Sequence, residues 1–420
     1  MKFTGLTAIV AGVLTMLAPS AALGGADIHG FLQGNYALRA AGADCPPGFD
    51  CAFMRAEERL DLRLDLASED GRAAAHARVD FFHDALRGAA GVDVREAFAV
   101  VNLGGFSARL GRQTITWGLG ELVFINDVFP KDWVAFLTGA PLEYLKLGSD
   151  ALLLGLYPSW LSFEVIAVPI FQPDRVPSGS PLFFFDPMPA LSTRMVEKPA
   201  VEFENAQVAA RLYRSLGRYE AALYASRGFY GTPAGRPEPA AAPSRLVFFH
   251  PPRNTYGASF QGPVAWGVIS FEAGYYDSVD DRGGSNPMID NPEVRGLAGY
   301  QIELWDDASA GVQYYLEVMT MHDRYRAALP PGMPARDQYR HVTSLRFRQF
   351  LLHQTLQAGF FVMGSPSDED IFVNPSVRYH VADELWAEIG GNLFFGKKAH
   401  TFFGQFEDNN HVYVTARFAF

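Results

Sequence analysis

Residues 59–66 read Arg59-Leu60-Asp61-Leu62-Arg63-Leu64-Asp65-Leu66, so every even position is leucine and every odd position is charged. Successive side chains of a β-strand point to opposite faces, and this alternation therefore predicts a strand with one apolar and one charged face. Other segments alternate in the same way, at residues 74–81, 205–212, 312–319 and 412–420. The sequence thus predicts an all-β fold.

The composition excludes a bundle of transmembrane helices. Of the 420 residues, 49% are hydrophobic and only 19% are charged, yet the mean hydropathy is +0.01. Apolar residues are therefore plentiful without being gathered into the repeated runs of about 20 that spanning helices require. Strands with one apolar face, in a sandwich or a barrel, fit this composition.

The only long apolar run lies at the N-terminus, where Lys2 precedes residues 6–17. Small residues follow it, namely Ala21, Ala22, Gly24 and Ala26. A positive start, a short apolar run and small residues are the layout of a secretory signal peptide. We expect residues 1–26 to be a cleaved signal peptide, with cleavage after Gly24 or Ala26, and residues 27–420 to form a single domain.

About eighteen segments of roughly ten residues can be placed along the chain, which is the length that a tilted strand needs to cross a bilayer. Their predicted starts are residues 27, 54, 72, 94, 105, 149, 160, 201, 217, 254, 266, 294, 310, 338, 353, 370, 384 and 410. One hairpin is easily miscounted at this level, so sixteen strands are also compatible with the sequence.

The connections between these segments alternate in length. After even-numbered segments the turn is short, as at Glu69-Asp70-Gly71, Gly104-Gly105, Pro158-Ser159, Leu216-Gly217, Asp306-Asp307 and Ala382-Asp383. After most odd-numbered segments the loop is long and rich in Pro, Gly and Asp, as in residues 39–52, 118–147, 172–199, 229–253, 280–293 and 323–337. Outer-membrane barrels have this asymmetry, whereas a soluble β-sandwich gives no reason for it. The sequence therefore predicts a transmembrane, antiparallel, up-and-down β-barrel.

The last residues, Val412-Tyr413-Val414-Thr415-Ala416-Arg417-Phe418-Ala419-Phe420, resemble the C-terminal strand of bacterial outer-membrane barrels, which typically ends in Phe. The resemblance implies that Phe420 and the alternating residues before it are recognised by the barrel-insertion machinery. It also implies that the protein lies in the outer membrane, in contact with its lipid.

The two cysteines lie close together in Asp44-Cys45-Pro46-Pro47-Gly48-Phe49-Asp50-Cys51. In an exported chain such a pair predicts a disulfide between Cys45 and Cys51. A metal site is the alternative, but two thiols without nearby histidines leave a metal short of ligands. The formal net charge of −11 and the lack of a basic tract argue against a nucleic-acid partner.

If the apolar stripes face lipid, the alternate residues face the lumen. The predicted lumen residues are Arg59, Asp61, Arg63, Asp65, Arg78, Asp80, Arg109, Arg211, Glu220, Gln313, Glu317, Arg346, Arg348, Arg378, Glu388 and Arg417. Arginines exceed carboxylates in this set, and rings of charge set the ion preference of a pore, so a weak anion preference is one hypothesis. The alternative is that these residues pair across strands and leave no net field.

The segment from Arg95-Glu96-Ala97-Phe98 to Trp133 resembles uncharacterised porin-like bacterial families. It contains Gly111-Arg112-Gln113, Trp117-Gly118 and a loop with Asn126-Asp127 and Pro130-Lys131-Asp132. It is more distantly similar to the alginate-export type of barrel. The match covers some forty residues, and the remaining chain supports only the general barrel class. The resemblance implies a transport role and fixes no substrate, and the sequence lacks the long Arg/Lys series expected of a polyanion exporter.

The loop 118–147 is long and apolar, and we expect it to fold into the barrel and narrow the lumen. Its polar residues Glu121, Asp127, Lys131 and Asp132 would then face the passage, and a short helix is predicted to start at Pro130. A loop that caps the outer rim or packs on a neighbouring subunit is the alternative. The apolar, proline-rich connection 171–199 is expected to plug part of the mouth or to offer a contact surface.

No motif for catalysis stands out. The sequence has no Gly-x-Ser-x-Gly elbow, no Walker motif, no haem-binding Cys-x-x-Cys-His and no zinc spacing, so we expect no cofactor and no metal. The first hypothesis is accordingly a porin-like channel for small solutes or ions. An exporter or uptake channel for a polysaccharide or an apolar compound is the second, and a barrel enzyme is the third. A homo-oligomer is compatible with the sequence but not indicated by it.

Overall fold

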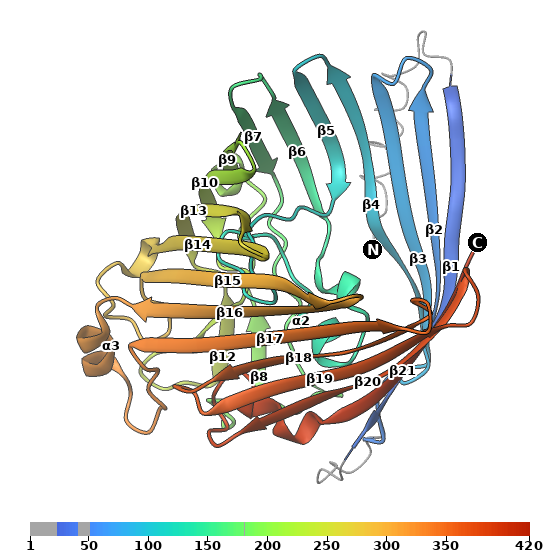
Figure 1. Ribbon diagram of the computed structural model, residues 1–420. Coiled ribbons are helices and arrows are strands. Elements are labelled where there is room, and N and C mark those ends of the chain that lie inside the picture. Colours follow the sequence, from blue (N-terminus) through green and yellow to red (C-terminus); the bar gives the residue numbers. More distant parts are fainter. Residues whose placement is uncertain (1–22, 41–50, 180) are drawn as a thin grey trace.

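The computed structural model describes residues 23–40, 51–179 and 181–420, which form a closed barrel of eighteen antiparallel strands (Figure 1). The predicted fold class is confirmed. The barrel strands are β1 Leu23–Arg39, β2 Phe53–Ser68, β3 Ala73–Asp84, β4 Ala89–Leu103, β5 Phe106–Gln113, β6 Ser149–Leu156, β7 Ser162–Val168, β9 Gln207–Leu216, β10 Tyr219–Phe229, β13 Pro252–Val264, β14 Gly267–Ser278, β15 Glu293–Trp305, β16 Ala308–Met319, β17 Tyr339–Leu351, β18 Leu356–Ser365, β19 Asp370–His380, β20 Leu385–Gly396 and β21 His411–Ala419.

The remaining elements lie in the connections. They are the helices α2 Trp133–Leu137 and α3 His322–Ala328, the 3₁₀ turns η1 Leu142–Leu145, η2 Phe203–Asn205, η3 Val279–Asp281 and η4 Gly404–Asn409, and the short strands β8 Thr193–Val196, β11 Ala234–Glu238 and β12 Arg245–Phe249. The short strands form a separate three-stranded sheet, in which β12 pairs with β11 antiparallel and with β8 parallel. Among the described residues, no helix has the length and apolar composition needed to cross a membrane.

The first and last strands close the barrel. β1 pairs antiparallel with β21 from Phe31 opposite Ala419 to Arg39 opposite His411. The pairing continues to the last residue, because the amide of Gly30 donates to the carbonyl of Phe420 (2.9 Å) and the amide of Phe420 donates to that of Gly30 (3.0 Å). This seam pairs β1 from residue 30 to residue 39, so within that span the sheet has no unpaired strand edge, which lipid would not tolerate. Recognition of Phe420 by the insertion machinery stays a prediction.

The two rims of the barrel differ as the sequence predicts. Short turns connect β2 to β3, β4 to β5 and every later pair on the same rim, and the start of β1 and the end of β21 lie on that rim too. Gly104 and Gly217 sit in two of these turns with φ angles of 64° and 66°, which glycine adopts without strain. Long connections join most strands at the other rim, although residues 85–88 and 366–369 are short there too.

The outer surface of the barrel is apolar. On β21, Val412, Val414 and Phe418 are exposed, while the alternate residues His411, Tyr413 and Thr415 are buried toward the interior. Exposed leucines, isoleucines and aromatic residues recur on the outward face of the other barrel strands. A water-soluble barrel would have the opposite polarity, so this surface is suited to the hydrocarbon core of a bilayer.

The predicted strand starts agree closely with the structure. The largest differences are at β9, which begins at residue 207 instead of 201, and at β4, which begins at 89 instead of 94. Residues 203–205 form the turn η2, which delays β9, and the small residues at the start of β4 hide its alternation.

Cys45 and residues 1–22 lie outside the described residues. β1 begins at Leu23, within the expected signal peptide, whose cleavage, like the Cys45–Cys51 disulfide, stays a prediction.

A charge on the outward face should cost most at mid-strand. Leu223 on β10 is 58% exposed and Leu216 at the end of β9 is 49% exposed. We expect Leu223→Arg to lower the free energy of unfolding by about 2–4 kcal/mol, and Leu216→Arg, at the rim, by at most about 1 kcal/mol. Urea unfolding in liposomes measures both. Equal costs at the two positions would contradict the assignment of the outward face to lipid.

Candidate functional site

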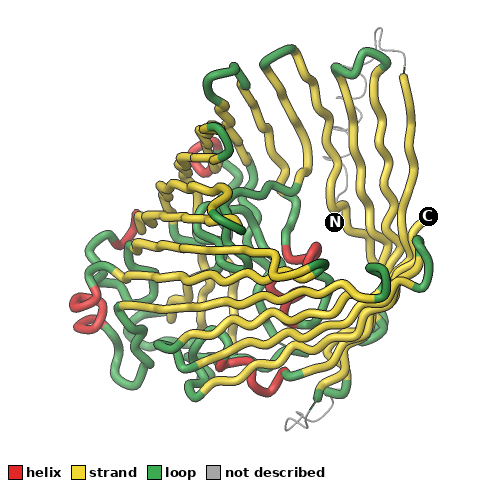
Figure 2. The backbone as a smooth tube through the Cα atoms, in the orientation of Figure 1, coloured by secondary structure: helices red, strands yellow, loops and turns green. Residues whose placement is uncertain are grey.

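Residues 114–148, which connect β5 to β6, lie across the interior of the barrel. The amide of Glu121 donates to Gln313 Oε1 on β16 (2.8 Å), and Asn392 Nδ2 on β20 donates to the Phe136 carbonyl (3.2 Å). Asn35 Nδ2 on β1 donates to the Gly139 carbonyl (3.2 Å). A segment that reaches strands on all sides of a barrel must be inside it, and Figure 2 shows loop and helix within the ring of strands. We name this segment the lumen loop.

Burial of apolar side chains explains why the lumen loop folds inward. Its residues Ile125, Phe136, Leu137 and Leu145 are buried in one cluster with inward-facing apolar residues of the barrel wall. The wall residues in that cluster include Ala37, Met54, Leu297, Tyr315, Val342, Met363, Phe372, Phe394 and Tyr413. Burial of such side chains is worth about 1.5–3 kcal/mol each relative to exposure in water.

One carboxylate of the wall anchors the start of the lumen loop. Glu272 on β14 accepts hydrogen bonds from the amides of Leu119 (2.7 Å), Gly120 (3.2 Å) and Asn126 (2.8 Å), and from Asn126 Nδ2 (2.9 Å). Gly118 precedes these donors with a φ of 83°, and a Cβ atom there would lie 2.7 Å from Glu272 Oε1. Glycine is therefore required where the loop passes this carboxylate. The sequence analysis did not single out Glu272.

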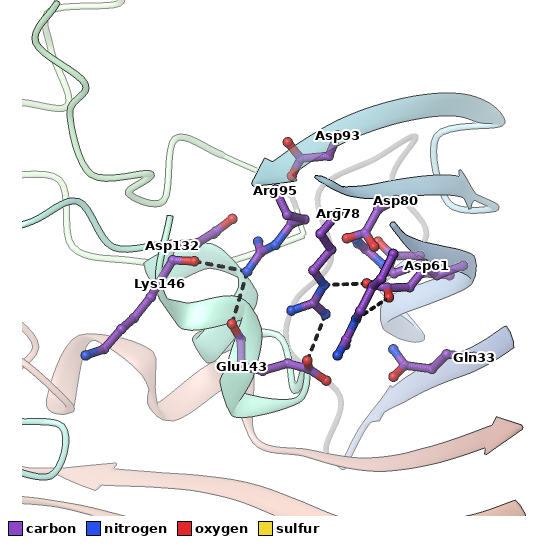
Figure 3. Close-up of polar contacts among 12 residues, drawn as sticks. Gln33, Asp61, Arg78, Asp80, Asp93, Arg95, Asp132, Glu143 and Lys146 are labelled. Atoms are coloured by element: carbon purple, nitrogen blue, oxygen red, sulfur yellow. Dashed lines mark hydrogen bonds and ion pairs between the residues drawn. The ribbon is translucent and has the colours of Figure 1, made fainter. Parts of the chain in front are cut away.

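The opposite edge of the lumen loop meets arginines of the wall. Glu143 in η1 forms ion pairs with Arg78 on β3 (Nη2 to Oε2, 2.8 Å) and with Arg417 on β21. Arg95 on β4 donates through Nη2 to the carbonyls of Glu143 and Lys146, both at 3.0 Å. Figure 3 shows Arg78 directed at Asp61 and Glu143, and Arg95 directed at the same turn of the loop.

A second layer of carboxylates holds these arginines in place. Asp61 on β2 accepts from Arg78 (2.5 Å) and from Arg63 (2.8 Å). Arg59 pairs with Glu57 (2.8 Å) and with Asp80, and its guanidinium lies 4.4 Å from the ring centroid of Tyr144 on the lumen loop. The result is a buried charge cluster of the arginines 59, 63, 78, 95 and 417 with the carboxylates 57, 61, 80 and 143.

The two loop carboxylates respond differently to their surroundings. Burial alone would raise the pKa of Glu143, but the Arg417 and Arg78 guanidiniums hold it below the ordinary value of 4.5. Burial raises the pKa of Glu121, although Arg346, which pairs with it at 2.7 Å, and Arg348 oppose the shift. Contact with arginine therefore decides the direction of the pKa shift at Glu143, whereas burial decides it at Glu121.

The predicted lumen residues lie on the inward positions of their strands, and most of the arginines among them are ion-paired. Besides the cluster above, Arg211 pairs with Glu164 (2.8 Å) and Arg378 with Glu388 (2.8 Å).

The other predicted lumen residues also have neighbours in the wall. Asp65 contacts His76 (2.6 Å), and Glu317 contacts Arg336 (3.2 Å). Arg109 lies 4.9 Å from the ring centroid of Phe98. Gln313 contacts the lumen loop, and Glu220 lies near Gln261 (3.5 Å). Their role in lining a pore stays a prediction.

Three residues expected to face the passage form contacts that hold the lumen loop in place, although Asp132 also lines the larger cavity described below. Asp127 and Lys131 are only 5% and 3% exposed, and their side chains pair with each other at 2.9 Å. Lys146 also pairs with Asp127, at 2.6 Å. Asp132 caps α2 by accepting from the Ala135 amide (2.8 Å) and pairs with Arg175 (3.0 Å). Each of these buried charges has a partner of opposite sign, as burial of a charge requires.

The lumen loop separates two cavities. The larger one, about 1400 Å³, lies toward the long loops and is lined by Thr138 and Tyr144 of the lumen loop. The smaller one, about 630 Å³, lies toward the short turns and is lined by Gly139, Glu143 and Leu145. Because neighbouring residues face opposite cavities, the barrier at residues 138–145 is a single chain thick.

The connection between β7 and β9 lies across the mouth of the barrel. The amide of Phe183 donates to Asn409 Oδ1 (2.9 Å), and Asn409 Nδ2 donates back to the Phe183 carbonyl (2.6 Å). Arg175, earlier in the same connection, reaches Asp132 on the lumen loop. The sheet of β8, β11 and β12 belongs to this cover, which accounts for the apolar composition of residues 171–199.

Acid should break the ion pairs of Glu143 at a lower pH than the ion pair of Glu121. Because the pKa of Glu143 is lowered, its ion pairs persist above the ordinary value of 4.5 and are lost only as the pH falls through the lowered value. We expect the protection of amides 142–146 against hydrogen exchange to fall in the wild type only at that acidic pH, and to be lower in Glu143→Gln already at neutral pH. Glu121→Gln is the control: the pKa of Glu121 is raised, so this substitution should leave the most acidic step in place. An acid step that survives in Glu143→Gln would refute the role of Glu143.

No protein-family model matches the sequence, and no curated protein matches it either. The structure is similar to solved structures of outer-membrane porins. OccD3 (OpdP) of Pseudomonas aeruginosa aligns over 97% of this chain and 96% of its own, with 9% identity and a TM-score of 0.55. OccK11 (OpdR) of the same organism aligns over 95% and 97%, with 10% identity and a TM-score of 0.54.

A mutant porin of Rh. blastica aligns over 94% of this chain and all of its own, with 12% identity and a TM-score of 0.42. The resemblance of residues 95–133 to uncharacterised porin-like families stays a prediction. At these identities the likeness concerns the fold. The chain therefore has the fold of an outer-membrane porin: a closed 18-strand β-barrel with an apolar outer surface.

Proposed function

We propose that the protein is a porin-like channel of the bacterial outer membrane for the passive passage of small solutes, narrowed by the lumen loop. The observation that carries the proposal is the loop itself, which crosses the interior and leaves cavities of about 1400 and 630 Å³ on its two sides. The fold of the solved porins supports it. Export through the signal peptide 1–26 and insertion through Phe420 belong to the same proposal.

The passage runs, in this proposal, between residues 142–146 of the lumen loop and the wall formed by β1 to β4 and β21. The other edges of the loop are closed by the apolar cluster and by the Glu272 anchor. The remaining edge is polar: Arg59 and Arg95 line the larger cavity, and Glu143 and Lys146 line the smaller one. Water and small solutes pass a charged, hydrated edge more readily than a packed apolar one.

The pairing of arginines with carboxylates makes any anion preference weak. Nine arginines are among the predicted lumen residues, and within the described part of the chain only Arg109 and Arg348 of these nine form no ion pair. Arg348 lines the smaller cavity together with Arg346 and Arg378, which are paired with Glu121 and Glu388. We propose that Arg348 supplies the weak preference for anions.

Planar-bilayer recordings under a salt gradient test the channel and its preference together. The wild type should give steady current steps with a reversal potential on the anion side. Arg348→Gln should keep the conductance and lower the anion-to-cation permeability ratio by roughly twofold, because one uncompensated charge is lost.

Arg218→Gln is the matched control, since Arg218 is exposed in the turn between β9 and β10, at the rim. Silence from well-folded wild-type protein would refute the channel. A cation preference in the wild type, or an equal shift in the control variant, would refute the assignment of the preference to Arg348.

A further inference from the structure

The larger cavity is built by the long loops at the mouth of the barrel. Its lining includes residues of the connections 169–206, 230–251, 279–292 and 320–338, together with α2 of the lumen loop as the floor. A solute that enters from the long-loop side meets this cavity before it reaches the charge cluster. The chemistry of these walls therefore decides which solutes are concentrated above the passage.

Apolar side chains from all four connections remain half-exposed around this cavity. They are Phe184, which also packs against the lumen-loop cluster, and Phe185, Met188, Phe248, Met288 and Met333. A folded loop normally buries such groups against its own core, as the lumen loop does with Phe136 and Leu145. Methionine and phenylalanine that converge on one cavity from separate loops are typical of sites for apolar ligands, because thioether and aromatic groups adapt to varied apolar surfaces.

The arginines that line the same cavity already have partners within the protein. Arg55 pairs with Glu57 (2.9 Å), Arg175 with Asp132 (3.0 Å) and Arg87 with Asp84 (2.6 Å). Likewise, Arg194 pairs with Asp186 (2.5 Å), Arg59 pairs with Glu57 and Asp80, and Arg95 donates to two carbonyls. Every arginine that lines the cavity within the described residues thus has an ion-pair or hydrogen-bond partner, so an anionic ligand would have to displace an existing contact.

The mouth is also held in one arrangement. Arg39 Nη2 donates to the Pro181 carbonyl (2.7 Å), and the Arg39 guanidinium lies 4.6 Å from the ring centroid of Phe183. β12 ties two of the connections together by pairing with both β8 and β11. A cavity whose walls are fixed before the ligand arrives loses less entropy on binding than a mobile mouth.

We propose that the larger cavity is a binding site for a bulky, uncharged and mostly apolar organic molecule, such as a compound with fused aromatic rings. The proposal rests on the proposed channel function and deepens it, since it names the solute class that is retained above the passage. Sugars fit poorly, because their hydroxyl groups would lose hydrogen bonds to water against methionine and phenylalanine walls.

Photo-crosslinking of the full-length protein in liposomes tests the site. The probe is an uncharged naphthyl diazirine, and the labelled peptides are mapped after irradiation. Labelling is expected at residues 181–190, 286–290 and 331–335, and excess 2-naphthol should suppress it while sucrose should not. Labelling confined to the outward face of the barrel strands, or suppression by sucrose as well, would overturn the proposal without the use of any variant.

A set of methionine variants adds a matched control. Met188→Gln, Met288→Gln and Met333→Gln combined keep the side-chain length, remove the thioethers, and should lower loop labelling by about tenfold, equivalent to about 1.4 kcal/mol. Met195→Gln changes a methionine of β8 that is 42% exposed but does not line the cavity, and it should leave labelling unchanged. Equal labelling in the triple variant and the wild type would also overturn the proposal.

The same samples distinguish this proposal from the channel function. Normal current steps with no loop labelling would mean that the channel stands and the binding site does not. Loop labelling with no current would mean that the cavity binds apolar molecules in a protein that does not conduct. Wild-type conductance in the triple variant shows in addition that its barrel is folded.

Discussion

The pairing of β1 with β21 is the constraint on which the rest of the structure depends. An unpaired strand edge in lipid leaves backbone groups without hydrogen bonds, at a cost of several kcal/mol for each group. Closure from Arg39 to Gly30 removes that edge and creates an inside and an outside. Closure therefore separates the two faces of each strand: the leucine face contacts lipid and the charged face contacts the lumen.

The closed barrel also determines where the lumen loop can go. Its apolar side chains are excluded from water, and the enclosed interior is the nearest place where wall residues can cover them. Two carboxylates then hold opposite edges of the lumen loop, one through hydrogen bonds from backbone amides and the other through ion pairs. Glu272 accepts from backbone amides, whose positions depend on the loop conformation, whereas Glu143 is held by guanidiniums, whose attraction depends on ionisation and salt.

The two cavities on either side of the lumen loop differ in how far their charged side chains are paired. Above the lumen loop, arginines and carboxylates cancel and leave an apolar surface of methionine and phenylalanine. Below it, Arg348 stands beside Arg346 and Arg378 without a carboxylate of its own in the described chain. A single loop thus separates a surface suited to apolar contact from one with a slight excess of positive charge.

The sequence by itself limited the strand number to sixteen or eighteen and predicted the faces of the strands and the two rims, because a period of two and the lengths of turns are local properties. It also located the lumen loop through its apolar composition. It did not reveal Glu143, which reads as one charge among apolar neighbours in Leu142-Glu143-Tyr144-Leu145, nor did it reveal the burial of Asp127 and Lys131.

Only the tertiary structure decided those points. Glu143 meets Arg78 from 65 positions away and Arg417 from 274 positions away, and no local pattern encodes such a meeting. Which strands face the loop is set by the register and closure of the whole sheet, so the two arginine partners of Glu143 come together only once the last strand has paired with the first.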